Sequence, residues 1–367
     1  MLSVIPAPKK AKELGGVFVL PARLKVKSDF DLPLLEGRVD FCENESDATV
    51  VIIKNESIAK EGYTLGVTRE CIVILASQKI GVYYALQTVR KIAHVDTGGR
   101  EVPCCDIEDE PRFPFRGISL DVSRHFYDVD YIKQYINWLF MEKLNVFHWH
   151  LTDDVGWRVE IKKYPLLTEI GSKRAYTQLD GWQSTKMEKK PYSGYYTQEQ
   201  IKEIVAYAKE RGITVIPEID FPAHCAAVFS AYSNLACRDL KRDVPGYFGA
   251  KIPTKIFNQK DWNRTLCMGK EESLQFVYDV LDEICEMFDS PYIHLGGDEA
   301  PMDEWKKCPN CQRVMKENNL KNEKELQAQK ELLSQKDEQI INQQEQLSQK
   351  DEELLNQQEQ LSQKDEQ

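Results

Sequence analysis

The sequence predicts an α/β protein with about four repeated βα units, as in a parallel sheet covered by helices or a βα barrel. From Arg116 onward, short apolar runs alternate with longer amphipathic stretches, as in strands followed by helices. Short strands and one helix precede these units, and a Gln-rich repeat follows them. We therefore expect a small α+β domain over residues 1–110, a partial barrel over 111–327 and a helical or disordered tail over 328–367.

The composition excludes several classes of protein. The 367 residues are 42% hydrophobic and 29% charged, enough for about two domains with cores. The mean hydropathy of −0.50 and the lack of an apolar run of about 20 residues argue against a membrane span. The net charge of −11 argues against a nucleic-acid partner. The N-terminus lacks the apolar segment of a secretory signal, which leaves the compartment unknown.

The first 110 residues contain several short apolar runs typical of strands. These runs include VFVL (17–20), ATVVIIK (48–54) and CIVILA (71–76). A helix is expected over residues 80–94, where apolar residues recur at helical spacing. No titratable cluster or glycine-rich loop indicates a chemical site in this part, and a linker, EDEPRFP (108–114), follows it.

Four barrel strands and three helices are expected after the linker. The strands are RGISLD (116–121), NVFHWHL (145–151), ITVIPEID (213–220) and YIHLGG (292–297), and the helices span 129–142, 197–211 and 271–288. Each strand ends in polar or ionisable residues: Asp121 and Arg124; His150, Asp153 and Asp154; Glu218, Asp220 and His224; Asp298 and Glu299. Because βα barrels build active sites at the C-terminal ends of their strands, these residues are candidates for one site.

The string HLGGDE (294–299) carries the sharpest local signal. Adjacent side chains on a regular strand point to opposite faces, so Asp298 and Glu299 can converge only at a strand end or turn. Gly296 and Gly297 supply the conformational freedom for such a turn. The alternative is an ordinary strand-to-helix turn with a carboxylate near the helix cap.

Two enzyme classes compete for these residues. His148 and His150 lie two residues apart on one strand and could bind metal in an amidohydrolase-like barrel. That interpretation expects the pair on the first barrel strand, whereas here it lies on the second. The rival is carboxylate acid-base chemistry on a glycosidic bond, supported by Arg124 and by aromatic residues. The aromatic candidates are Trp149, Trp157 and Trp182.

One close cysteine pair occurs, Cys308-Pro-Asn-Cys311. It could be half of a zinc site, a redox pair or a local disulfide. No second CxxC or HxxxH follows it. We therefore do not expect a zinc site at this pair.

Four ordered motifs resemble the family 20 glycoside hydrolases, the β-N-acetylhexosaminidases. They are RGISLDVSRHF (116–126), NVFHWHLTDDVGWR (145–158), VIPEIDFPAH (215–224) and HLGGDE (294–299). The resemblance, which covers about residues 1–327, implies a (β/α)8 TIM-barrel type catalytic domain, of which only about four βα units are present, with no metal and no other cofactor. It also implies a carbohydrate substrate with a terminal β-linked N-acetylhexosamine, hydrolysed with retention by a substrate-assisted mechanism.

The resemblance also implies roles for five residues. Glu299 is the general acid and then the base, and Asp298 orients the substrate's acetamido group. Arg124 holds sugar hydroxyls, while Asp153 and His224 form a charged relay behind Glu299. The alternative for Arg124, Asp153 and His224 is a set of structural ion pairs at the barrel rim.

The sequence departs from the family pattern in two respects. Ala223 replaces the usual glycine before His224, which matters if that position needs a positive φ. The resemblance also stops near residue 327, before the later barrel strands, so we expect open sheet edges. This leaves a second hypothesis, in which the chain is a truncated non-catalytic remnant or a coiled-coil interaction protein.

The last 40 residues repeat with a period of 14 residues and hold 4 Lys and 10 acidic residues. Aliphatic residues recur every seven positions: Leu333, Ile340, Leu347, Leu354 and Leu361. The second core position of each heptad is polar, so a strong coiled coil is not expected. We expect a solvated helix or disorder over residues 328–367, with weak self-association at most.

Overall fold

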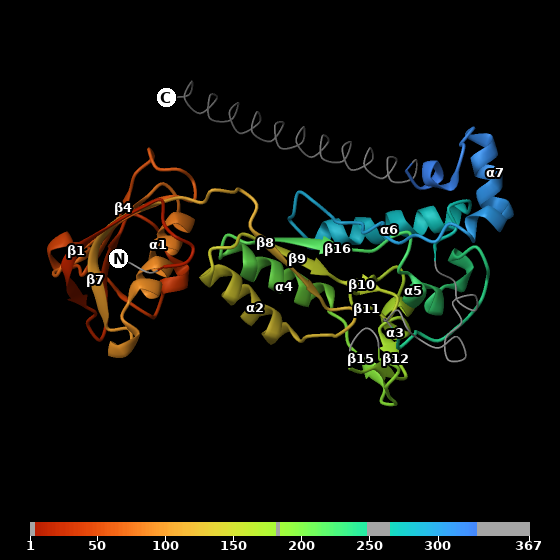
Figure 1. Ribbon diagram of the computed structural model, residues 1–367, viewed down its shortest axis with the longest axis horizontal. Helices are drawn as coiled ribbons and strands as arrows, with labels where there is room; N and C mark the ends of the chain where they lie inside the picture. Colours follow the sequence, from red (N-terminus) through yellow and green to blue (C-terminus); the bar gives the residue numbers. More distant parts are fainter. Residues whose placement is uncertain (1–3, 181–183, 248–264, 329–367) are drawn as a thin grey trace, which may run out of the picture.

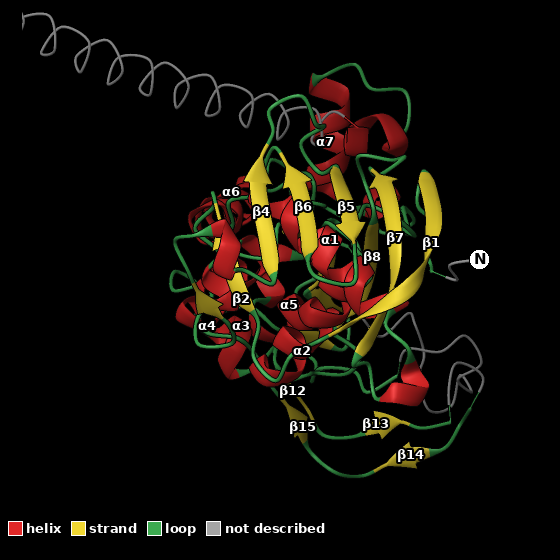
Figure 2. Ribbon diagram, turned by 90° about the vertical axis from the view of Figure 1, so that its left-hand side faces the viewer, coloured by secondary structure: helices red, strands yellow, loops and turns green. Residues whose placement is uncertain are grey.

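A computed structural model describes residues 4–180, 184–247 and 265–328. Its N-terminal part is a seven-stranded sheet with one long helix (Figure 1). The strand order is β1-β7-β5-β6-β4-β2-β3. These strands are β1 (Lys10–Val19), β2 (Lys25–Ser28), β3 (Asp40–Phe41), β4 (Val50–Lys54), β5 (Tyr63–Val67), β6 (Ile72–Ala76) and β7 (Glu101–Asp109). Figure 2 shows β4, β6, β5, β7 and β1 side by side.

Helix α1 (Lys79–Ile92) packs on this sheet. Val82, Ala85 and Val89 are buried on its inner side, as their helical spacing predicts. Strands β5 and β6 alternate buried and half-buried residues, the period of two expected when one face of a sheet lies on a core. The small α+β domain that the sequence predicts is therefore present.

The second part contains a parallel sheet ordered β16-β9-β8, with three long helices. Its strands are β8 (Gly117–Asp121), β9 (Val146–His150) and β16 (Thr214–Glu218), and the helices are α2 (Val129–Met141), α4 (Gln198–Lys209) and α6 (Glu271–Met287). The first three predicted βα strands and all three predicted helices are confirmed. The parallel sheet and the helices appear at the centre of Figure 1.

The fourth predicted strand, 292–297, is shorter than the sequence suggests. It makes one isolated parallel bridge, between Glu218 and His294. His294 donates its N–H to Pro217 at 2.9 Å. The chain then leaves the extended conformation because Gly296 and Gly297 have φ values of 65° and 90°.

The two faces of the parallel sheet differ in chemistry. Phe147 and Trp149 of β9 are fully buried in the core formed with α2, α4 and α6. His148 and His150 alternate with them and therefore point to the opposite face. One face is thus covered by helices, and the other presents ionisable groups.

Strand β8 is an open edge within the described residues. Its five residues are exposed or half-buried, whereas β9 and β16 are almost entirely buried. Ile118 is 47% exposed and Phe115, just before the strand, is 61% exposed. The described residues thus form an open sheet, with the open edge that the sequence predicts, and a closed eightfold barrel stays an expectation from the family resemblance.

Shorter elements connect this framework. They are β10 (Thr152–Asp153), β11 (Gly156–Trp157), β12 (Lys173–Arg174), β13 (Thr177–Gln178), β14 (Met187–Glu188), β15 (Tyr192–Ser193), α3 (Leu166–Glu169), α5 (Ala226–Ala231) and α7 (Pro309–Glu317), with 3-10 turns at Pro33–Leu35, Glu45–Asp47, Val95–Thr97, Ser233–Leu235 and Trp305–Lys307. In the described ranges, no helix is long and apolar enough to cross a membrane. The predicted tail lies almost wholly outside the described residues, which end at 328.

A buried lysine joins the two parts of the molecule. The Lys143 ammonium, after α2, donates to Tyr63 at 2.8 Å, to Thr88 at 2.7 Å and to Asp109 at 3.1 Å, all in the N-terminal part. Arg116 adds an ion pair of 2.6 Å with Glu61. These contacts fix the N-terminal part against the start of the parallel sheet.

Candidate active site

Three parallel strands deliver charged residues to one level of the sheet. In the strand register, Asp121 of β8 lies beside His150 of β9, which in turn lies beside Glu218 of β16. All three are the last residues of their strands. The predicted convergence at the C-terminal strand ends is therefore present.

Arg124 and buried Asp153 form the base of the site. Arg124 Nη2 lies 2.6 Å from Asp153 Oδ2, and its Nη1 donates to Asp121 at 2.8 Å. Asp153 is only 3% exposed. Burial by itself would raise the pKa of Asp153, but contacts with His150, His224 and Arg124 outweigh it and lower that pKa. Asp153 is therefore an ionised carboxylate held by cationic groups.

His224 lies between this carboxylate and Glu299. Its Nδ1 is 3.4 Å from Asp154 and 3.6 Å from Asp153, and its Nε2 is 3.6 Å from Glu299. Asp153 and Asp154 raise the pKa of His224 against the effect of burial. Asp153 and His224, the residues predicted to stand behind Glu299, thus lie in a row with it, and Arg124 contacts the far side of Asp153. The histidine contacts exceed ideal hydrogen-bond lengths.

The alanine that departs from the family pattern causes no strain. The positive φ in this turn belongs to His224, at 50°, and Ala223 is not among the described residues with positive φ. A non-glycine residue at positive φ persists where the surrounding structure holds it in place. The pairing of His224 with Asp153 and Asp154 supplies that support.

Glu299 also has a left-handed backbone, with φ of 49°, directly after the turn at Gly296 and Gly297. Its side chain is 73% exposed. Its carboxyl group therefore faces solvent, with His224 behind it. Asp298 is exposed too, and it has a carboxylate oxygen within 4.8 Å of Asp220 and His224. The structure thus brings both candidate carboxyls beside the same histidine.

Asp220 is a site residue to which sequence reasoning gave no role. It is 2% exposed, and burial, opposed by His224 and assisted by Asp153 and Asp298, raises its pKa to about 7. Its Oδ1 accepts the N–H of Gly297 at 3.3 Å. A Cβ on Gly296 would lie 2.0 Å from the same oxygen, so this approach requires glycine. The polar end of the predicted third strand was the only sequence signal for Asp220.

The histidines of the metal alternative surround one carboxylate. Glu218 lies 2.8 Å from His148 Nε2, 2.7 Å from His150 Nδ1 and 3.1 Å from His294 Nδ1. Burial opposes ionisation of Glu218, but these histidines lower its pKa overall. Three ligand atoms from His148, Glu218 and His294 lie close enough to hold an ion, so geometry leaves this alternative open.

The sequence analysis proposed three tryptophans as aromatic residues of the sugar site, and this prediction is wrong for two of them. Trp149 and Trp157 are at most 1% exposed and belong to the hydrophobic core. Their position on the helix-covered side follows from the alternation of side chains along a strand and hairpin. Trp182 lies outside the described residues.

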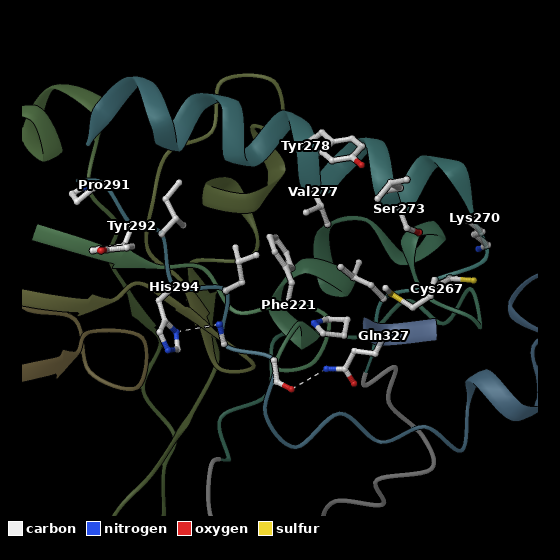
Figure 3. Close-up of a pocket in the computed structure, with 18 residues that line it drawn as sticks. Phe221, Cys267, Lys270, Ser273, Val277, Tyr278, Pro291, Tyr292, His294 and Gln327 are labelled. Atoms are coloured by element: carbon white, nitrogen blue, oxygen red, sulfur yellow. Dashed lines mark hydrogen bonds between the residues drawn. The ribbon is translucent and has the colours of Figure 1, made fainter. Parts of the chain in front are cut away.

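A cavity lies next to this site. It has a volume of about 650 Å³ and lies between α6 and residues 291–297, lined mainly by apolar side chains (Figure 3). Gln327 donates to the Gly297 carbonyl at 3.0 Å on its rim. The described lining includes His294 and Gly297 but none of Arg124, His224 and Glu299. We therefore place the chemistry at the strand ends and not in this cavity.

Comparisons with known proteins match both parts of the chain. The model for "Glycosyl hydrolase family 20, catalytic domain" matches residues 113–366, and the model for domain 2 of the same family matches residues 1–110. A beta-hexosaminidase of Porphyromonas gingivalis is 40% identical over 327 residues, covering 87% of this chain and 39% of that protein. A beta-hexosaminidase of Vibrio furnissii is 34% identical, covering 89% of this chain and 53% of that protein.

Solved structures give the same result. A beta-N-acetylhexosaminidase from Bacteroides fragilis superposes with a TM-score of 0.75 at 35% identity, covering 89% of this chain and 62% of that one. An exo beta-N-acetylglucosaminidase from Vibrio harveyi, in complex with N-acetylglucosamine, gives a TM-score of 0.74 at 33% identity. It covers 88% of this chain and 51% of that one. The chain thus spans about half the length of these relatives.

Proposed function

Because the chain belongs to glycosyl hydrolase family 20, we propose that its strand-end site removes terminal β-linked N-acetylhexosamine from carbohydrate substrates, with retention and by substrate assistance. The contact that carries this proposal is the one between exposed Glu299 and His224, with buried Asp153 behind the histidine. Family membership also removes the basis for the amidohydrolase alternative, in which His148 and His150 would bind a catalytic metal.

Glu299 is the general acid and base. It faces solvent, where a glycosidic oxygen can approach it, and it gives that oxygen a proton as the bond breaks. The resulting carboxylate is stabilised by protonated His224, whose own charge is held by Asp153 and Asp154. The same carboxylate then takes a proton from the water that completes hydrolysis.

Asp298 acts on the 2-acetamido group. The carbonyl oxygen of that group attacks the anomeric carbon, and positive charge develops on the resulting oxazolinium ring. A carboxylate beside the ring nitrogen orients the group and stabilises this charge. Asp220, buried behind Asp298 and hydrogen-bonded to Gly297, supports the turn that presents both carboxyls.

Arg124 binds sugar hydroxyls. Its guanidinium is paired with Asp121 and Asp153, yet the Arg124 side chain remains 28% exposed, and a guanidinium has five N–H donors, so some can serve a ligand. Burial works against the charge on Arg124, but the two aspartates raise its pKa overall. The group is therefore a fixed cation in the floor of the site.

The test is hydrolysis of a chromogenic N-acetyl-β-glucosaminide by the full chain. Glu299→Gln and Asp298→Asn are expected to lower kcat by about 10²- to 10⁴-fold, the usual contribution of a positioned acid-base group. Glu203→Gln, an exposed change on α4, is the matched control and leaves the rate unchanged. Equal rates in all four proteins contradict the assigned roles.

A second candidate, sugar binding without catalysis, is favoured by the open edge of β8 within the described residues. Calorimetric titration with N-acetylglucosamine distinguishes it. Binding without hydrolysis, weakened by Arg124→Ala, supports this second candidate. A chain that neither hydrolyses the glycoside nor binds the sugar contradicts both candidates.

A further inference from the structure

Four cysteines from three separate segments meet at one point of the fold. Cys237 follows the turn at 233–235, Cys267 precedes α6, and Cys308 and Cys311 lie at the start of α7. Figure 3 shows Cys267 at the end of α6 nearest Lys270. The CxxC pair could supply only two of the four ligands of a zinc site. The other two, Cys237 and Cys267, lie 30 positions apart in the sequence and meet the pair only in the fold.

The sulfur positions match the corners of a tetrahedron. Cys267 Sγ lies 3.6 Å from Cys308 Sγ and 3.7 Å from Cys311 Sγ, and Cys237 Sγ lies 3.8 Å from Cys311 Sγ. All four sulfurs lie within 4.8 Å of one another. Four thiolates bound to zinc at about 2.3 Å are about 3.8 Å apart. A disulfide needs about 2.05 Å, so none of these pairs is bonded in the structure.

The backbone around the sulfurs is shaped for this cluster. Gly269 lets the turn after Cys267 lie against the turn between Cys308 and Cys311, since a Cβ on Gly269 would be 2.3 Å from the Cys311 nitrogen. Cys308 and Cys311 occupy the N-cap and first turn of the nine-residue α7, where the helix dipole favours thiolates.

The surroundings suit a closed structural site. Cys267, Cys308 and Cys311 are at most 4% exposed, packed with fully buried Trp305 and with Met315. Trp305 donates to the Leu266 carbonyl at 2.9 Å, which links α6 to the α7 segment. A basic residue lies within three sequence positions of each of these cysteines: Arg238, Lys270, Lys307 and Arg313.

From this geometry we propose that Cys237, Cys267, Cys308 and Cys311 bind one structural zinc ion. The ion ties the start of α6 to the segment that follows Asp298 and Glu299. It takes no part in catalysis, because four protein ligands leave no open coordination position. The proposal does not depend on the hydrolase function.

The first test is the metal content of the full chain purified without chelator. Mass spectrometry is expected to find about one zinc per chain. The variant Cys308→Ser/Cys311→Ser loses it, whereas Cys42→Ser/Cys71→Ser, a matched pair in the N-terminal part, keeps it. Iron in place of zinc overturns the assignment of the ion.

The second test needs only the unmodified chain, so it holds even where the double variant fails to fold. Replacement of zinc by cobalt is expected to give the intense visible absorption of tetrahedral cobalt thiolate. Chelation is expected to lower the Tm. The proposal is overturned if the wild-type protein contains no zinc and these cysteines react freely or pair as disulfides.

Discussion

At the residue scale, Asp220 is a buried carboxyl group that supports the turn before the two candidate catalytic carboxyls. It lies two residues after β16, is almost fully buried, and accepts the Gly297 N–H that holds the turn before Asp298 and Glu299. Its carboxyl group faces His224, Asp153 and Asp298. One cation and two anions surround it, so its ionised form is poorly compensated.

The pKa of about 7 for Asp220, raised from 3.8, makes stability fall as pH rises. The folded state holds the Asp220 proton more tightly than the unfolded state, so protonation of Asp220 favours folding. This stabilisation is fully present below about pH 4 and is lost as the pH rises through 7. Asp220→Asn is expected to raise the free energy of unfolding at pH 8 by up to about 4 kcal/mol, with little change at pH 4. Urea unfolding at both pH values checks this.

The matched control for Asp220 is Asp282→Asn, an exposed aspartate on α6. It is expected to change stability by less than about 0.5 kcal/mol at either pH. A pH-independent effect of Asp220→Asn contradicts the raised pKa.

At the element scale, helix caps set the loops that carry the site. Asp128 caps α2 by accepting the N–H of Tyr131 at 2.8 Å, and Arg124 lies in the short loop between β8 and this cap. Thr197 and Gln200 form a reciprocal capping box at the start of α4. Each helix therefore starts at a fixed residue, which fixes the length of the loop before it.

Loss of the α4 cap has a predictable cost. Thr197→Ala removes the acceptor of the Gln200 N–H and is expected to lower the free energy of unfolding by about 1 kcal/mol. Thr197→Ser keeps the hydroxyl and is expected to stay within about 0.5 kcal/mol of wild type. Chemical unfolding measured on all three proteins checks this, and equal losses in both variants show that the cap does not contribute.

At the scale of the whole molecule, Lys143 couples the two parts. Its ammonium is 7% exposed and its partner Asp109 12% exposed. Burial lowers the pKa of Lys143, although Asp109 partly offsets this. Removing one partner of such a buried pair leaves the other charge uncompensated.

Lys143→Met is therefore expected to cost about 3–5 kcal/mol. It also frees the N-terminal part from the sheet, so trypsin is expected to cut faster in the linker after exposed Arg112. Lys133→Met, which breaks a surface pair with Glu203, costs less than about 1 kcal/mol. Limited proteolysis and urea unfolding measure both effects, and unchanged linker cleavage in Lys143→Met contradicts the coupling.

The sequence by itself determined the three long barrel helices, the first three βα strands and the polar residues at their ends. Periodicity located α2, α4 and α6, and polar strand ends located Arg124, Asp153, His224, Asp298 and Glu299. These features are local, because a helix or strand exposes or buries a residue according to its place in a short repeat. Four strings of local sequence were also enough to indicate the family.

Only the tertiary structure decided the features that depend on distant segments meeting. Trp149 and Trp157 point into the core, and Asp220 is desolvated by groups from other strand ends. Cys237 and Cys267 complete the set begun by Cys308 and Cys311. The physical reason is the same in each case: burial, charge compensation and metal geometry depend on spatial neighbours, and spacing along the chain does not specify those neighbours.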